Sequence, residues 1–221
     1  QITLAQNADD KAALLEKLNQ AMPEEIGDVA LWVQDLDFVI GELAKLNGNR
    51  EMFRGMLNLD RIAISGYSKG GVVAAHACMT DQRFAAGINL SGFMFGDIHL
   101  NPIKVPFMNL ESEESWCENC VPINDIIYDK AESDVFMIQI KGATHGNFTD
   151  LSAFKNYISP DLDGLLGPMD GLRFLEIQSE YICSFLDQYV RGNSSRKVEE
   201  LAGKYPEVRF KTNSITPVSE K

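Results

Sequence analysis

The sequence predicts an α/β fold in which helices cover both faces of a mostly parallel sheet. The main observation is that short apolar runs, flanked by polar or glycine-containing loops, alternate with segments whose apolar residues repeat at helical spacing. The second observation is the composition, since 45% of the 221 residues are hydrophobic and 24% are charged, as in ordinary globular domains. A chain of this length and composition can bury the core of one domain.

Four segments have the pattern of helices. The first two are amphipathic and are separated by Pro23, and Asn47-Gly48-Asn49 ends the second because such residues tolerate the left-handed conformation at a helix C-terminus. The third consists of small and apolar residues, and the fourth is strongly amphipathic. The predicted helices are 9–22, 24–46, 70–79 and 172–190.

The predicted strands are four apolar runs, at 61–65, 86–90, 104–110 and 135–140. Four strands with helices on both faces would leave an edge of the sheet exposed. We therefore expect an N-terminal segment or a companion chain to complete the fold, with residues 1–211 as the C-terminal portion of a single domain. Residues 212–221, rich in Ser and Thr, are expected to form a flexible tail.

The charge of the chain excludes some classes of partner. A net charge of −12 at pH 7 argues against binding to nucleic acid or to anionic membrane surfaces, and places no restriction on a small neutral substrate. No run of 18 apolar residues is present, so no membrane span is expected. The first ten residues lack the parts of a signal peptide and include no Met, which is typical of a processed or partial chain.

The four cysteines include one close pair, Cys117 and Cys120, in a CxxC spacing. A zinc site would need two more ligands, and no second Cys or His pair has a matching spacing. The favoured interpretation is a small loop disulfide in an exported protein, periplasmic or extracellular, and two free thiols are the alternative. We expect neither a metal nor a cofactor.

Gly66-Tyr67-Ser68-Lys69-Gly70 is a GxSxG sequence in a strand–turn–helix context, as in the nucleophile turn of serine hydrolases. We expect glycine at 66 and 70 because a Cβ at either position would collide with the neighbouring strand or helix. The turn would present the Ser68 hydroxyl at a helix N-terminus, with the Lys69 backbone N–H as one oxyanion donor. A chance match in a glycine-rich turn is the alternative.

Of the three histidines, His145 is the predicted general base. It lies in a loop after the last predicted strand, and the order serine then histidine fits this architecture. His76 lies two turns into the helix after Ser68 and should point away from it. His99, in a loop after the second strand, is not excluded by its spacing, and a structural role for His145 is the alternative.

These motifs resemble the platelet-activating-factor acetylhydrolase-like and dienelactone-hydrolase-like branch of the α/β hydrolases. The resemblance implies the α/β-hydrolase fold and the metal-free hydrolysis of carboxylic esters with short acyl groups. It extends from about Glu24 to Phe210, and the nucleophile and histidine motifs are its most specific parts. The matching stretches are Leu59–Gly71, Asp81–Phe84, Gly87–Leu90, Ile140–His145 and Tyr205–Val208.

The chain departs from that family at the acid of the triad. Ser91 occupies the position where the family has an Asp that orients the histidine, and serine cannot hold a negative charge against an imidazolium. The family's His-Gly loop, which supplies the second oxyanion N–H, has no counterpart before Asp9. After the third strand, Glu113 is the preferred substitute acid, with Glu111 as an alternative on the same strand face. An acidic surface loop is the competing interpretation, and Asp97 is a weaker candidate.

The sequence therefore predicts a serine esterase. Ser68 would attack the ester, His145 would transfer the proton, Glu113 would fix the histidine tautomer, and Lys69 would contribute to the oxyanion hole. The main alternative is a catalytically impaired pseudohydrolase with a binding or structural role, which the serine at position 91 supports. A peptidase or acyltransferase on the same scaffold is the other.

Overall fold

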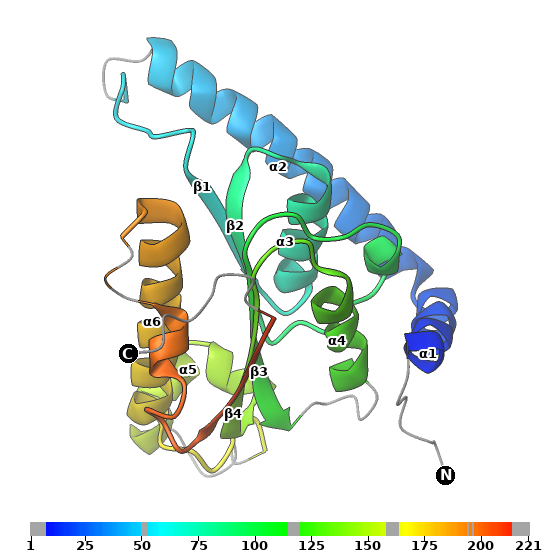
Figure 1. The fold of residues 1–221 in the computed structure, drawn as a ribbon, viewed down its shortest axis with the longest axis vertical. Coiled ribbons are helices and arrows are strands. Elements are labelled where there is room, and N and C mark those ends of the chain that lie inside the picture. Colours follow the sequence, from blue (N-terminus) through cyan, green and yellow to red (C-terminus); the bar gives the residue numbers. More distant parts are fainter. Residues whose placement is uncertain are drawn as a thin grey trace.

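A computed structural model of the chain describes residues 8–49, 53–114, 120–157, 164–193, 195 and 197–213. In these residues the sheet has the strand order β1-β2-β3-β4-β5 (Figure 1). The first four strands are parallel, and β5 runs antiparallel to β4 at one edge. The strands are β1 (Ile62–Tyr67), β2 (Phe84–Leu90), β3 (Phe107–Glu114), β4 (Val135–Thr144) and β5 (Val208–Thr212).

Helices cover both faces of the sheet, as Figure 1 shows. One face carries α1 (Ala8–Ala21), α2 (Pro23–Asn49), α3 (Lys69–Thr80) and α4 (Cys120–Lys130), and the other carries α5 (Leu151–Phe154) and α6 (Gly171–Leu186). The described residues also form short helical segments, at Asp97–His99, His145–Phe148, Lys155–Tyr157, Asp187–Arg191 and Val198–Leu201.

The alternation of side chains along the strands builds two separate hydrophobic cores. Phe107 and Val135 pack with α1 to α4, while the next residues in sequence, Met108 and Phe136, pack with α6. Successive residues of a strand point to opposite faces of the sheet. When helices cover both faces, apolar residues are therefore needed at odd and even positions of the strand alike. This explains why the central strands have nearly continuous apolar sequences.

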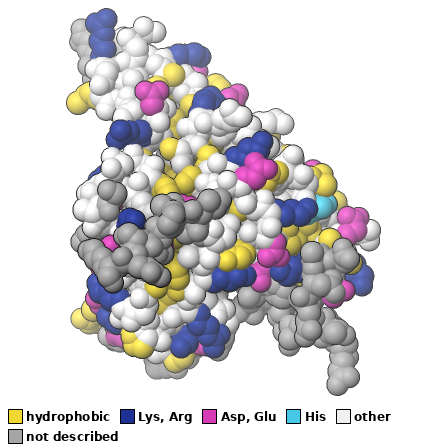
Figure 2. Space-filling view, viewed as in Figure 1, with side chains coloured by type: hydrophobic (Ala, Val, Ile, Leu, Met, Phe, Trp, Pro, Cys, Tyr) yellow, Lys and Arg dark blue, Asp and Glu magenta, His cyan; other side chains and the backbone are white. Residues whose placement is uncertain are grey.

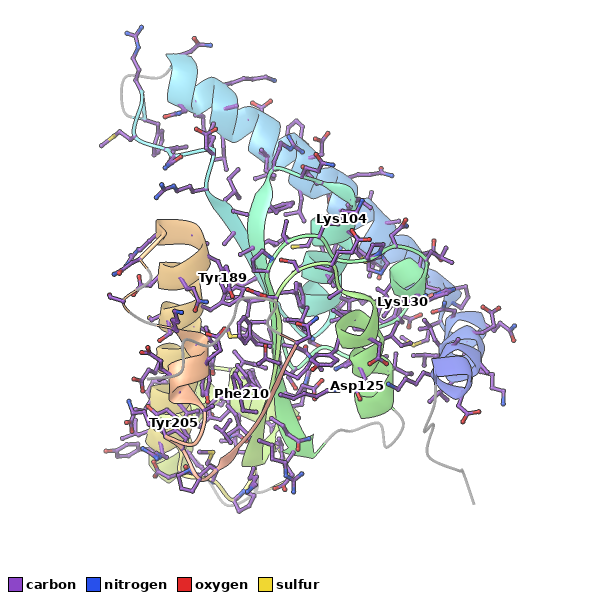
Figure 3. All side chains as sticks on the ribbon, in the orientation of Figure 1. Lys104, Asp125, Lys130, Tyr189, Tyr205 and Phe210 are labelled. Carbon is purple, nitrogen blue, oxygen red and sulfur yellow. The ribbon has the colours of Figure 1, made fainter. Side chains whose placement is uncertain are left out.

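The fold class predicted from the sequence is confirmed, with two corrections. The prediction of four strands was wrong, because β5 alternates apolar and polar residues and has no continuous apolar run. Phe210 stacks on Tyr181 of α6 at a centroid distance of 6.3 Å, whereas Lys211 forms an ion pair with Asp125 of α4 at 3.3 Å on the other face (Figure 3). Helix α4 was also missed.

Pairing in β5 extends to Thr212, and the Asn213 side chain accepts a hydrogen bond from Val135 N at 2.7 Å. Residues 214–221, the rest of the predicted tail, lie outside the described residues, and so do Cys117 and the side chain of Cys120. The described cysteines, Cys78 and Cys183, are free thiols.

On the face in Figure 2, acidic and basic side chains are interspersed. The helices of the described residues include none that is long and apolar enough to cross a membrane.

Candidate active site

Ser68 occupies a sharp turn between β1 and α3. Its backbone has φ 56° and ψ −125°, a conformation that is strained for a residue with a Cβ. The Ser68 N–H donates to Leu90 O at the end of β2 (2.9 Å), and the Ser68 carbonyl accepts from Gly71 N (2.9 Å). The turn therefore holds the serine at the carboxyl edge of the sheet, directly before the first residue of α3.

Two glycines make this turn possible, and one differs from the prediction. A Cβ on Gly66 would lie 2.0 Å from Gly70 O, so glycine is required there. The expectation for Gly70 was wrong, because a Cβ at that position meets nothing within 4 Å. The second constrained glycine is Gly71, whose Cβ would lie 1.7 Å from Asn89 Oδ1 on β2. Helical rotation by one residue turns position 71, and not 70, towards the sheet.

His145 follows β4 directly and lies beside the turn that contains Ser68. Its ring stacks on Tyr67, the residue before Ser68, with ring centroids 4.6 Å apart. The Tyr67 hydroxyl donates to His145 O at 3.2 Å. The structure thus brings His145 to Tyr67, the residue before Ser68, although 78 positions separate the two in the sequence. Partial burial lowers the pKa of His145, and its hydrogen bonding to Ser91 acts in the opposite direction.

The side chain that contacts His145 Nδ1 is Ser91, at an Nδ1–Oγ distance of 3.0 Å. Ser91 follows the end of β2 with φ 56°, and its N–H donates to Leu110 O of β3 at 2.8 Å. Its hydroxyl also lies 3.4 Å from the Ser112 hydroxyl near the end of β3. His145 Nδ1 therefore contacts a neutral hydroxyl, that of Ser91, and the group next to Ser91 at the end of β3 is a second neutral hydroxyl, that of Ser112.

Glu113 is not brought to His145. One of its carboxylate oxygens accepts from Gly142 N at 2.8 Å, and the other lies 3.6 Å from the Arg209 guanidinium. Alternation along β3 directs Ser112, and not its glutamate neighbours, towards Ser91. Asp97, the weaker candidate, lies in the segment near His76 instead.

Glu111 is buried on the side of β3 opposite to Ser112. Its Oε1 accepts hydrogen bonds from Asn109 Nδ2 (2.5 Å) and Asn124 Nδ2 (2.7 Å), and burial raises its pKa to about 7. Asn109 in turn accepts from Asn89 Nδ2 at 2.5 Å. This network of hydrogen bonds connects β2, β3 and α4. It links Glu111 through Asn109 to Asn89, the residue that packs against Gly71, and none of these bonds involves His145.

The other residues considered from the sequence, Lys69, His76 and His99, each have defined contacts. Lys69 is the first residue of α3, where backbone N–H groups have no partner within the helix, and its ammonium forms an ion pair with Asp28 at 2.7 Å. His76 Nε2 donates to Phe95 O at 2.9 Å, away from Ser68. His99 lies in the Asp97–His99 segment, and its backbone carbonyl accepts from Lys130.

Sequence reasoning missed two residues that shape this site. Tyr67 supports the His145 ring, and Asn89 occupies the space left open by Gly71 and donates to Gly92 O at 2.7 Å. Both lie inside the motifs that were recognised, but their contacts arise between neighbouring strands. A single strand pattern therefore gave no signal for them.

Most of the chain is similar to known proteins. A family model described as "Platelet-activating factor acetylhydrolase, isoform II" matches residues 14–201. The platelet-activating factor acetylhydrolase of Cavia porcellus is 28% identical over 76% of this chain and 39% of that protein. The enzyme of the same name from Canis lupus familiaris is 25% identical over 82% of this chain and 42% of that protein. The chain thus spans about two fifths of the length of these relatives.

A solved structure with the same fold is a ferulic acid esterase from Streptomyces cinnamoneus. It superposes with a TM-score of 0.71 and 24% identity, over 84% of this chain and 55% of that one. At this level of identity the likeness concerns the arrangement of strands and helices.

Proposed function

The chain belongs to the family described as platelet-activating factor acetylhydrolase, isoform II, and on this premise we propose that it is a serine esterase. The observation that carries the proposal is that His145, whose Nδ1 is 3.0 Å from Ser91 Oγ, stacks on Tyr67, the residue directly before the strained turn at Ser68. Carboxylic esters are the substrates, since the relatives carry the names of acetylhydrolases.

In the proposed mechanism, Ser68 Oγ attacks the ester carbonyl while His145 Nε2 accepts its proton. The Ser91 hydroxyl accepts a hydrogen bond from Nδ1–H, which leaves Nε2 unprotonated and able to act as a base. The negative charge on the carbonyl oxygen is stabilised by the Lys69 N–H at the start of α3. His145 then protonates the leaving alcohol, and water releases the acyl group from Ser68 by the reverse sequence.

A neutral partner for the histidine has a cost. A carboxylate would stabilise the imidazolium by charge, whereas Ser91 offers only a neutral hydrogen bond. We infer that Ser91 and the stacked Tyr67 fix the ring's tautomer and orientation, and that the site works without a charged third member. Glu113 remains the alternative acid if its side chain can leave Gly142 and Arg209.

Short acyl groups are proposed for two reasons. The related enzymes are named for the removal of an acetyl group. The cavity that contains Ser68 has a volume of about 250 Å³, and Phe93 and Phe95 form part of its wall. A group of a few carbons fits such a space more readily than a long chain.

A second candidate function is that of a pseudohydrolase that binds a ligand without turning it over. The serines at the ends of both β2 and β3 favour it, because neither can supply the charge of a triad acid. The two functions make opposite predictions for Ser68, since a binding protein does not need an activated hydroxyl.

The discriminating experiment is labelling with a fluorophosphonate probe, followed by intact-mass measurement. We expect wild type to gain one probe mass, Ser68→Ala to gain none, and Ser65→Ala to behave as wild type. Ser65 is a matched control, because it is an exposed serine on β1, the strand that leads to Ser68. An unlabelled wild-type protein would favour the pseudohydrolase.

We also propose that further polypeptide covers the outer edge of β1. In the described part of the chain this strand pairs with β2 alone, and the outward side of α2 exposes large apolar side chains. These are Leu31, Trp32, Phe38 and Val39. Exposed edges and apolar patches favour association. Residues 1–221 alone should therefore aggregate in size-exclusion chromatography, and an active, monodisperse monomer of 24.6 kDa would contradict this proposal.

A further inference from the structure

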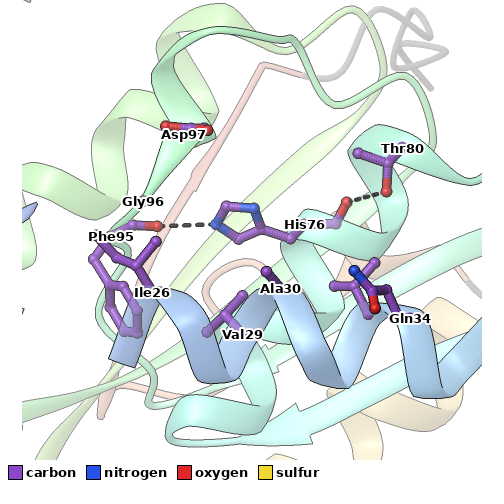
Figure 4. Close-up of a pocket in the computed structure, with 10 residues that line it drawn as sticks. Ile26, Val29, Ala30, Gln34, His76, Thr80, Phe95, Gly96 and Asp97 are labelled. Atoms are coloured by element: carbon purple, nitrogen blue, oxygen red, sulfur yellow. Dashed lines mark hydrogen bonds between the residues drawn. The ribbon is translucent and has the colours of Figure 1, made fainter. Parts of the chain in front are cut away.

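A groove between α2 and α3 leads away from Ser68, and its use as a substrate site rests on the proposed esterase function. Its first part is the cavity of about 250 Å³ that contains Ser68, with Met22 and Glu25 from the start of α2 and Val72 from α3. Its second part is a cavity of about 320 Å³ with walls from the following turns of the same helices (Figure 4).

Helical spacing makes these two cavities successive stretches of one groove. Along α3, Ser68 and Val72 line the first part, and His76 and Thr80 line the second. These four positions are each four residues apart, so they lie on one side of the helix. At the start of α2, Met22 and Glu25 line the first part, and the lining of the second part begins at the next residue, Ile26, and continues along the helix to Gln34.

Phe95 marks the boundary, because it lines both cavities. Its side chain is 2% exposed and its ring centroid lies 5.6 Å from that of Phe93. The backbone around it is held in place. His76 Nε2 donates to Phe95 O at 2.9 Å, and Gly96 N donates to Asn19 Oδ1 at 2.7 Å. The boundary is therefore a side chain on an anchored backbone.

The chemistry of the second cavity suits a hydrocarbon. Aliphatic side chains of α2 form its floor: Ile26, Val29, Ala30 and Val33. Burial lowers the pKa of His76, so the ring is neutral at pH 7, and its Nε2–H is already bonded to Phe95 O. Asp97 and Gln34 are exposed at the rim, which disfavours an anionic head group inside.

The position of His145 decides which part of an ester enters the groove. The base must deliver a proton to the leaving alcohol, so the alcohol lies on the side of His145 and Tyr67. Tyr67 packs against the core beside α6, whereas Val72 and Phe95 of the groove belong to the core beside α1 to α4, so the groove lies on the other face of the sheet. We propose that this groove is the acyl-binding site and that the Phe95 ring sets the acyl length, with short chains ending at the ring and longer chains excluded until it is removed.

The test is a chain-length series of p-nitrophenyl esters, from acetate to hexanoate and decanoate. Phe95→Ala should raise kcat/KM for decanoate relative to acetate by at least about 10-fold, which is the effect of burying roughly two additional methylenes. Adding Ala30→Phe should abolish the gain, because the larger side chain would fill the second cavity. Ala30 is exposed on α2 and lines the second cavity but not the first.

Two controls keep the result interpretable. Phe95→Leu retains an apolar side chain and should give a smaller gain, while thermal melts establish that each variant is folded. Binding of dansyl-undecanoic acid to Ser68→Ala, followed by fluorescence, tests the groove without catalysis. We expect Phe95→Ala to tighten this binding about 10-fold or more and Ala30→Phe to reverse it.

The failures are distinguishable. Absence of ester cleavage and of fluorophosphonate labelling in every variant would defeat the proposed function, while the dansyl titration would still decide on the groove. An unchanged chain-length ratio together with unchanged dansyl affinity in a folded Phe95→Ala protein would overturn the role of Phe95.

Discussion

Two turns of this molecule each contain a serine with a positive φ, and their surroundings differ. Ser68 follows β1 and Ser91 follows β2, both with φ 56°. Each donates its N–H to a backbone carbonyl of the next strand in the sequence, Ser68 to Leu90 O at 2.9 Å and Ser91 to Leu110 O at 2.8 Å. Ser68 is followed at once by α3, whereas Ser91 is followed by Gly92 and a non-helical segment that leads to Phe95.

In the proposed mechanism, a serine with a positive φ is not enough to make a nucleophile, and the neighbours of each serine decide its role. Ser68 has a helix N-terminus behind it, which favours developing negative charge. Ser91 instead contacts Nδ1 of His145, the nitrogen that does not face the reaction in the proposed mechanism. The same residue type with the same φ is therefore assigned two roles by its neighbours in the proposed mechanism. The predictions below test this assignment.

The largest effect is expected at the first turn. Ser68→Ala should lower kcat for p-nitrophenyl acetate by roughly 10⁴–10⁶-fold with little change in KM, because the variant has no hydroxyl to form the acyl-enzyme. Steady-state kinetics measure this, with Ser65→Ala as the matched control. Retention of most of the activity would mean that Ser68 is not the nucleophile.

The second prediction concerns the glycines that shape this turn. Gly71→Ala should destabilise the protein by roughly 1–3 kcal/mol or more, because its Cβ would lie 1.7 Å from Asn89 Oδ1. Gly70→Ala should leave stability unchanged or raise it by up to about 1 kcal/mol, since it replaces a helical glycine in open space. Urea denaturation compares the two. Equal losses would contradict the packing described for the turn.

At the second turn, Ser91→Asp should move the pH dependence. Burial lowers the pKa of His145, so the acid limb of kcat/KM in wild type should have its midpoint below the ordinary value of 6.5. The base acts when neutral, so activity falls as pH falls through this pKa. A carboxylate at 91 would stabilise the charged ring, raise the pKa of His145 and shift the acid limb to higher pH. An unshifted limb would place the aspartate away from the ring.

Removing the Ser91 hydroxyl should have a moderate effect. Ser91→Ala is expected to lower kcat roughly 3–10-fold, the rate equivalent of one neutral hydrogen bond of about 0.5–1.5 kcal/mol. The KM for p-nitrophenyl acetate should change little, since Ser91 contacts the base and not the substrate. A loss of 10³-fold or more would show that the hydroxyl does far more than orient the ring.

The smallest effect is expected for Glu113→Gln. Its carboxylate accepts from Gly142 N and lies 3.6 Å from Arg209 at the surface, so kcat should stay within about twofold of wild type. The same kinetic assay decides the matter. A decrease of 10²-fold or more would instead make Glu113 the triad acid, and would show that its side chain moves to His145 during catalysis.

The sequence by itself determined the fold class and the family, and both are confirmed by the parallel sheet and by the family match over residues 14–201. It also located the turn at Ser68 and the loop at His145, because strand, glycine turn and helix are local patterns. The requirement for Gly66 could be anticipated for the same reason. Strand β5 and helix α4 lacked such a continuous pattern.

Only the tertiary structure decided which groups meet His145. Ser91, Ser112 and Glu113 lie at the ends of two different strands, and a shift of one residue along a strand moves a side chain to the other face. The register of β2, β3 and β4 turns Ser112 towards Ser91, buries Glu111 and leaves Glu113 at Gly142. A sequence pattern gives the spacing of residues along one strand, whereas contacts between strands depend on how the strands are aligned.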